Sequence, residues 1–293
     1  MNQLVPKNIL AARSRLGECP VWDAQQQRLF WVDVYNHRLH QFDPATGSDR
    51  YFDLGEVVSA IALTDTNQLL LALRDRLILF NLQTETVTPL CQITFSQPTT
   101  RLNDGKCDPQ GRFWIGTVCT IKGEANLYRY NPDGSLQVME TELTISNGLG
   151  WSPDGVTFYL TDSALHHIYA YDFEGRTGTI SNRRLLIDLS QEGVEPDGLT
   201  IDTEGNIWSA LWNGWCVACF SPAGQELFRV PLPVQRPTSV TFAGPDLTDL
   251  YITSASVGLS QREIQQGFMA GDLFHCSAPV PGLPTQRFLT RSS

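Results

Sequence analysis

The sequence lacks any long apolar run. Its 293 residues contain no stretch of the roughly 20 apolar residues that a membrane-spanning helix needs, so we expect no membrane association. Residues 1–7 also lack the apolar core of a secretion signal, which favours a cytoplasmic location. No segment rich in glycine, serine or proline divides the chain. We therefore expect a single domain that spans residues 1–293.

The sequence is equally poor in paired cysteines and histidines. Its seven cysteines are an odd number in a long chain, which fits reduced thiols better than a disulfide framework. Cys216 and Cys219 have the spacing of half a zinc site or of a redox pair, but no second pair accompanies them, so we interpret them as core thiols. The five histidines form no His-x-x-x-His pair, and there is no Gly-x-Ser-x-Gly elbow. These absences leave little support for a catalytic nucleophile.

Positive charge and helical periodicity are scarce as well. Lysine and arginine number 21 against 31 aspartates and glutamates, which gives a net charge of −10. This balance argues against nucleic acid or an anionic membrane as a partner. Apolar residues instead recur in short alternating runs, such as residues 28–33 and 38–43, with turns rich in glycine, proline and aspartate between them. These patterns favour an all-β protein.

What the sequence does contain is a pattern repeated six times, in which an apolar residue follows a polar one by four positions. The pairs are Glu18/Trp22, Ser59/Leu63, Asn103/Cys107, Asn147/Trp151, Asp197/Ile201 and Thr238/Phe242. Successive copies are 41, 44, 44, 50 and 41 residues apart. A repeat of about 40–50 residues with strand-like content is typical of a β-propeller blade. We therefore predict a six-bladed β-propeller with the six polar positions around the mouth of its axis.

The blades must also close into a circle. The segment before each polar position reads as the outermost strand of the preceding blade, so residues 8–12 are predicted to complete the sixth blade. Such closure removes the free sheet edges that invite aggregation. Loops at residues 35–37, 118–124, 163–166, 212–214 and 254–271 are predicted to surround a pocket above the polar positions. The longest of them, residues 254–271, is the natural lid.

Three of the polar positions carry strong oxygen donors. Glu18, Asn147 and Asp197 offer two carboxylates and one amide, with Asn103 beside them. Donors of this kind suit hard cations such as Ca²⁺, Mg²⁺ or Mn²⁺, and a divalent ion would offset the burial and repulsion of two carboxylates. The alternative is that these side chains merely cap strand ends by hydrogen bonding to the backbone.

Arg101 lies two residues before Asn103. Alternation along a strand places both side chains on the same side, so the guanidinium is predicted to face the pocket beside the polar positions. A guanidinium there can bind substrate oxygens or an anionic transition state. The alternative is an ordinary salt bridge to a nearby carboxylate.

These segments carry a resemblance to the gluconolactonase/regucalcin (senescence marker protein) family. The similar segments include residues 16–22, 101–106, 146–149, 180–184, 196–198 and 271–274. The resemblance implies a six-bladed propeller that hydrolyses sugar lactones with a divalent cation in its axial mouth. It implies Glu18, Asn147 and Asp197 as metal ligands, and Arg101, Asn103 and Asp104 as substrate contacts. Residues 118–121 depart from the acidic stretch of animal members, which predicts the loss of a contact to a substrate hydroxyl.

We therefore expect a metal-dependent lactonase that opens aldonolactones such as gluconolactone. The cofactor would be one divalent ion, with Ca²⁺ favoured and Mg²⁺, Mn²⁺ or Zn²⁺ as alternatives. Asp197 is the candidate catalytic base if one of its oxygens is free of the metal. The expected partner is a small sugar lactone, and the chain is expected to be a monomer or a weak oligomer. The alternatives are a calcium-binding regulator without turnover and a propeller scaffold for protein partners.

Overall fold

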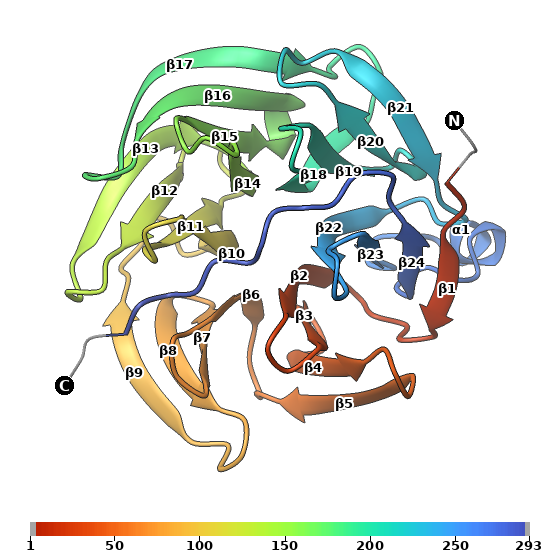
Figure 1. Ribbon diagram of the computed structural model, residues 1–293, viewed down its shortest axis with the longest axis horizontal. Coiled ribbons are helices and arrows are strands. Elements are labelled where there is room, and N and C mark those ends of the chain that lie inside the picture. Colours follow the sequence, from red (N-terminus) through yellow and green to blue (C-terminus); the bar gives the residue numbers. More distant parts are fainter. Residues whose placement is uncertain (1–3, 291–293) are drawn as a thin grey trace.

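The structure is a computed structural model that describes residues 4–290. Its strands form six antiparallel sheets of four strands each, arranged around a central axis (Figure 1). The first strand of each repeat lies nearest the axis, and the axial strands contact one another around the ring. The prediction of an all-β, six-bladed propeller is confirmed.

Five blades are built from consecutive strands, from the axis outward. The first three are β2 (Gly17–Asp23), β3 (Arg28–Asp33), β4 (Arg38–Asp43) and β5 (Ser48–Asp53); β6 (Val58–Leu63), β7 (Gln68–Leu73), β8 (Arg76–Asn81) and β9 (Val87–Gln92); and β10 (Arg101–Cys107), β11 (Phe113–Val118), β12 (Ala125–Tyr130) and β13 (Leu136–Leu143). The next two are β14 (Ser146–Trp151), β15 (Thr157–Asp162), β16 (His167–Glu174) and β17 (Thr179–Asp188); and β18 (Glu195–Ile201), β19 (Ile207–Trp212), β20 (Cys216–Phe220) and β21 (Glu226–Pro231).

The sixth blade closes the circle with strands from both ends of the chain. It contains β22 (Pro237–Ala243), β23 (Asp249–Ser254), β24 (Leu273–Ser277) and, outermost, β1 (Lys7–Leu10). β1 pairs antiparallel with β24, and the Asn8 amide donates a hydrogen bond of 2.6 Å to Asp272. The predicted closure is confirmed, with the strand at Lys7–Leu10 rather than at residues 8–12.

The core lies between neighbouring blades, where strand faces pack on one another. Two equivalent tryptophans, Trp114 on β11 and Trp208 on β19, are almost fully buried. Each indole donates a 2.9 Å hydrogen bond to the buried aspartate that follows the axial strand, Asp108 or Asp202. Because a buried indole N–H needs an acceptor, these aspartates fix the second strand against the first. Cys216 and Cys219 are buried free thiols on β20, as interpreted from the sequence.

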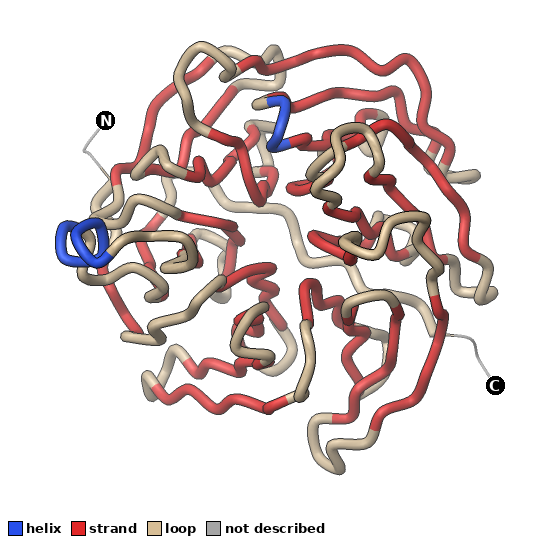
Figure 2. Tube along the Cα trace, turned by 180° about the vertical axis from the view of Figure 1, so that it is seen from behind, coloured by secondary structure: helices blue, strands red, loops and turns tan. Residues whose placement is uncertain are grey.

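The two ends of the axis differ. The axial strands begin at one end, where the longer loops include the 3₁₀ turn η1 (Ser163–Leu165) and the short helix α1 (Gln261–Gln266), seen from behind in Figure 2. The sequence pattern did not reveal α1, which Ser260 caps through a reciprocal pair of hydrogen bonds with Glu263. At the other end, the segment that follows β24, residues 278–290, crosses the axis in Figure 1. We call it the C-terminal segment.

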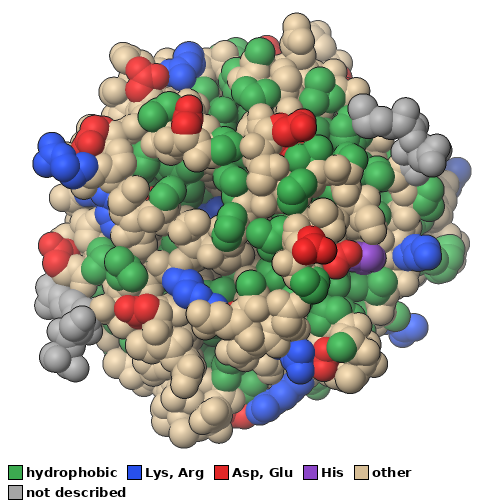
Figure 3. Space-filling model, viewed as in Figure 1, with side chains coloured by type: hydrophobic (Ala, Val, Ile, Leu, Met, Phe, Trp, Pro, Cys, Tyr) green, Lys and Arg blue, Asp and Glu red, His purple; other side chains and the backbone are tan. Residues whose placement is uncertain are grey.

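This C-terminal segment is fixed at both of its ends. Gly282 forms a bridge with Asp202 after β18, and Phe288 forms one with Thr64 after β6. On the same face, acidic and basic side chains lie scattered among apolar and neutral ones (Figure 3). Within residues 4–290, no helix is long and apolar enough to cross a membrane.

Candidate metal and substrate site

A local irregularity occurs at the same place in all six axial strands. The pairing register with the second strand shifts at Glu18/Val21, Val58/Ala60, Leu102/Gly105, Ser146/Leu149, Pro196/Leu199 and Pro237/Ser239. Each shift includes or adjoins the polar position found in the sequence. A bulge redirects a side chain that regular pleating would place in the sheet face. The bulges therefore give the six polar positions their common place at the mouth of the axis.

Two glycines allow the axial strands to approach closely beside this mouth. A Cβ atom at Gly148 would lie 2.3 Å from the Asp197 carbonyl oxygen and 2.6 Å from the Leu199 nitrogen. A Cβ atom at Gly198 would lie 2.1 Å from the Ser239 hydroxyl oxygen. Because Gly148 directly follows Asn147, its lack of a side chain lets the Asn147 segment approach Asp197, while Gly198 does the same between β18 and β22.

Asn147 and Asp197 each present a buried oxygen without a hydrogen-bond partner. The Asn147 amide nitrogen donates to the Ser163 hydroxyl at 3.1 Å, and Ser163 donates in turn to the Pro196 carbonyl at 2.6 Å. These contacts fix the orientation of the amide, yet Asn147 Oδ1 has no donor. Asp197 is 5% exposed, and its Oδ1 also has no donor. Buried oxygens of this kind are costly unless a donor or a cation satisfies them.

Other buried carboxylates at this end of the axis show what a structural cap looks like. Asp33 accepts hydrogen bonds from the backbone of Arg15 and Leu16 at 3.1 and 3.2 Å. Asp162 likewise accepts from the backbone of Thr144 and Ile145, both at 3.1 Å. These aspartates hold the segments that enter β2 and β14. The Gly198 backbone donates to the Asp197 carboxylate, but Asp197 Oδ1 has no such donor, so capping leaves this oxygen unsatisfied.

The electrostatics of the site favour a bound cation. Burial, and secondarily the charge of Asp104, raise the pKa of Glu18 to about 8. Burial and the charge of Glu18 raise the pKa of Asp197 well above its usual range. Both shifts report that ionised carboxylates are unfavourable here without a counter-charge. A divalent cation between Glu18, Asn147 and Asp197 would supply that charge, so the residues present fit such an ion.

Arg101 and Asn103 form a connected pair beside these ligands. Arg101 Nη1 donates to the Leu102 carbonyl at 2.9 Å and to Asn103 Oδ1 at 2.8 Å. The Asn103 amide nitrogen donates to the Ser146 carbonyl at 3.0 Å, which ties β10 to β14. The guanidinium lies 5.8 Å from the centre of the Tyr35 ring, and its charge lowers the pKa of Glu18. Arg101 is therefore held beside Glu18 without a direct salt bridge.

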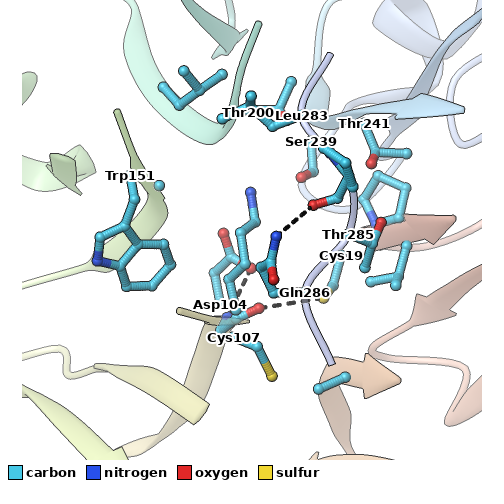
Figure 4. Close-up of a pocket in the computed structure, with 18 of the residues that line it drawn as sticks. Cys19, Asp104, Cys107, Trp151, Thr200, Ser239, Thr241, Leu283, Thr285 and Gln286 are labelled. Carbon is cyan, nitrogen blue, oxygen red and sulfur yellow. Dashed lines mark hydrogen bonds between the residues drawn. The ribbon is translucent and has the colours of Figure 1, made fainter. Parts of the chain in front are cut away.

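Asp104 lines an axial cavity to which Arg101 and Asn103 do not contribute. It is 7% exposed, accepts a 2.8 Å hydrogen bond from the Gly105 nitrogen, and lines a cavity of about 310 Å³ together with Cys19 and Lys106. Figure 4 shows Asp104 among the residues that line this cavity, with Gln286 of the C-terminal segment drawn beside it. Contact between Asp104 and substrate stays a prediction.

The predicted loops surround the mouth, and two of their residues interact with arginines. Arg15 lies 5.7 Å from the centre of the same Tyr35 ring that Arg101 contacts. Arg236 lies 4.6 Å from the Trp212 ring. His166 shares a 2.7 Å hydrogen bond with the Val194 carbonyl, as expected of a structural histidine.

The sequence assigned no role to two residues of this region. Ser163 orients the Asn147 amide, and a lone serine after a strand carries no recognisable signal. Lys106 donates a 2.7 Å hydrogen bond to the Leu199 carbonyl from within the axial cavity. Its spacing of two residues from Asp104 on a strand was the available signal, because alternation places both on one side.

Comparisons with known proteins show the family of the chain. The profile of the SMP-30/gluconolactonase/LRE-like region matches residues 16–256. The chain belongs to this family. A regucalcin of Gallus gallus is 34% identical over 285 residues, which cover 94% of this chain and 95% of the relative. A 6-deoxy-6-sulfogluconolactonase of Pseudomonas putida is 36% identical over 287 residues, which cover 96% and 97%.

Solved structures give the same fold. A calcium-binding protein named regucalcin from Agrobacterium tumefaciens superimposes with a TM-score of 0.93 at 27% identity, over 98% of each chain. In residues 4–290 of this chain, no group of three or more His, Cys, Asp or Glu side chains is arranged to hold a metal. The candidate set differs from such a group because its third ligand is the amide of Asn147.

Proposed function

We propose that this chain hydrolyses sugar lactones with one divalent cation, for which Glu18, Asn147 and Asp197 are the ligands. The observation that carries the proposal is the pair of buried, unpartnered oxygens of Asn147 and Asp197 on neighbouring axial strands. An all-oxygen set favours Ca²⁺, with Mg²⁺, Mn²⁺ or Zn²⁺ as alternatives. The lactonase activity is supported by relatives named as a pentonolactonase and a sulfogluconolactonase.

Each residue of the site has a distinct part in this proposal. When bound, the cation supplies Lewis acidity, which polarises a carbonyl group and stabilises negative charge on oxygen. Asp197 accepts the proton of the attacking water through the oxygen that is not used for the cation. Arg101 and Asn103 orient the lactone ring. Because both hydrogen bonds of the Arg101 guanidinium use Nη1, Nε and Nη2 are left for substrate oxygens.

The preference among sugars follows from the loop at residues 118–124. Its first residues carry no carboxylate, and the Thr120 hydroxyl is instead within 3.0 Å of the Thr99 hydroxyl. A carboxylate here would accept hydrogen bonds from sugar hydroxyls, so this contact is absent. We therefore expect the chain to depend less on the hydroxyl pattern of the lactone than members with acidic residues in this loop.

The test is a panel of aldonolactones of five and six carbons, followed with a pH indicator because hydrolysis releases a proton. We expect turnover that a chelator abolishes and that added Ca²⁺, Mg²⁺ or Mn²⁺ restores. Asp197→Ala should remove both turnover and cation binding. Turnover that continues unchanged in chelator would contradict the metal-dependent mechanism.

A second candidate is a calcium-binding protein without turnover. It is favoured by the similarity to proteins named regucalcin, one of which is described as calcium-binding. An ion buffer has no need of a fixed guanidinium such as that of Arg101 beside the cation. If the chain binds Ca²⁺ by calorimetry but hydrolyses no lactone of the panel, this second function replaces the first.

A further inference from the structure

Lys106 is a largely enclosed cation for which the proposed reaction has no use. It lies on β10, and its ammonium donates a hydrogen bond to the Leu199 carbonyl at 2.7 Å. Within residues 4–290, no carboxylate lies within ion-pair distance of this ammonium. Burying a charged ammonium costs several kcal/mol unless nearby charge offsets it. A charge of the opposite sign must therefore act on Lys106 from further away.

Asp104 is the carboxylate that does so. It lies two residues earlier on β10 and lines the same axial cavity as Lys106. Burial raises the pKa of Asp104 and lowers that of Lys106, and the charge of each group opposes the shift of the other. The two groups thus interact through charge across the cavity and not through a direct ion pair.

Asp104 also acts on the candidate ligands. Its charge raises the pKa of both Glu18 and Asp197, so it contributes to the negative potential at the mouth. The charge of Glu195 also raises the pKa of Asp197, whereas the charge of Arg101 lowers that of Glu18. Four carboxylates and two basic groups, Arg101 and Lys106, therefore act on this stretch of the axis. When all six are ionised, their net charge is −2, which a divalent cation neutralises. Without Lys106 the net charge would be −3.

We propose that Lys106 sets the ionic charge that the site accepts, by cancelling Asp104 so that the axis matches a divalent rather than a trivalent cation. The inference rests on the proposed function, since it takes Glu18, Asn147 and Asp197 as the cation ligands. Lys106 touches neither the cation nor the substrate in this scheme. It is a positioning residue that acts through the charge of Asp104.

The size of the effect follows from Coulomb's law. Removing one positive charge strengthens the binding of a cation in proportion to the charge of that cation. The binding free energy of a trivalent ion therefore improves more than that of a divalent ion. The difference equals the Coulomb energy between two unit charges. At ~8 Å and an effective dielectric constant of ~20, that energy corresponds to roughly thirtyfold in relative affinity.

The experiment compares La³⁺ and Ca²⁺ binding by calorimetry, in the absence of any lactone. Lys106→Met should raise the ratio of La³⁺ to Ca²⁺ affinity by roughly tenfold to a hundredfold over the parent chain. Asp104→Asn should shift the ratio in the opposite direction. The double variant should return it close to the parent value, because both charges are then removed.

Two further variants separate charge from structure. Lys106→Arg keeps the charge and should keep the parent ratio, whereas a packing role would not be rescued by the larger side chain. Lys7→Met removes an exposed charge on the outer strand β1 and should change nothing. If Lys106→Met is poorly folded by circular dichroism, Lys106→Gln removes the same charge with a polar side chain and takes its place in the comparison.

The outcomes distinguish the two proposals. An unchanged ratio in a folded Lys106→Met or Lys106→Gln variant overturns the role of Lys106, while the metal site stands if the parent chain binds Ca²⁺. A parent chain that binds neither ion overturns the metal site itself and, with it, this inference.

Discussion

Gly148→Ala tests whether the close approach of two axial strands builds the site. The added Cβ atom would lie 2.3 Å from the Asp197 carbonyl oxygen and 2.6 Å from the Leu199 nitrogen. Both obstacles are backbone atoms, so no side chain can rotate to relieve the contact. Reaching ordinary van der Waals distance requires β14 and β18 to separate by about 1 Å. We expect a loss of about 3 kcal/mol, the upper end for overpacking in a core.

The same separation moves Asn147 away from Asp197, because each ligand adjoins a displaced peptide. We therefore expect cation affinity to fall by at least about tenfold, since a ligand set tolerates little displacement. Stability is measured by urea denaturation in chelator, and affinity by calorimetry. For a chain of this length, the expected loss corresponds to a fall in melting temperature of roughly 6 °C.

A matched control lies two residues further along the same strand. At Gly150, a Cβ atom would meet only side-chain carbons of Ile201 and Leu199, at 3.0 and 3.1 Å. These side chains can adjust, so Gly150→Ala should cost less than about 1 kcal/mol and leave cation affinity unchanged. Equal stability and equal cation affinity of Gly148→Ala and Gly150→Ala would refute the reasoning.

Three other predictions concern charge, substrate and closure. The folded-state pKa of Glu18, about 8, exceeds its usual 4.5, so the cation-free folded chain retains a proton that the unfolded chain releases. Its stability should therefore fall as pH rises from about 4.5 to 8, by up to about 5 kcal/mol, in urea denaturation with chelator but not with saturating Ca²⁺. Arg101→Lys should lower lactonase kcat/KM by roughly tenfold to a thousandfold with cation binding retained, because the planar fork is lost. The guanidinium of Arg38 lies over Tyr51, so Arg38→Lys should leave kcat/KM unchanged. Equal losses in the two variants would contradict the assignment of Arg101. Deleting residues 1–13 should yield insoluble or strongly destabilised protein, and an unchanged melting point would contradict the closure.

The fold was predictable from the sequence because the residues of each blade carry the local signals for its strands and turns. Alternating apolar residues fix the strands, turn residues separate them, and the period of the repeat fixes the number of blades. The closure was predictable for the same reason, since a missing outer strand had to come from the other end of the chain. Helix α1 was not predictable, because it has only six residues and is stabilised by a capping box at Ser260, so it produces no apolar periodicity.

The candidate site was only partly predictable, and the bulges explain why. A regular strand alternates its side chains, so register alone does not say that Glu18, Asn147 and Asp197 converge on one axis. The repeat showed that they are equivalent, but the inward turn depends on a shifted register in each axial strand. Asp104 illustrates the difference. It directly follows Asn103 in sequence, yet the bulge in β10 places it in the axial cavity with Lys106, where its charge acts on the mouth from below. Charge effects across a cavity depend on this folded geometry, so they become visible only when the strands are assembled around the axis.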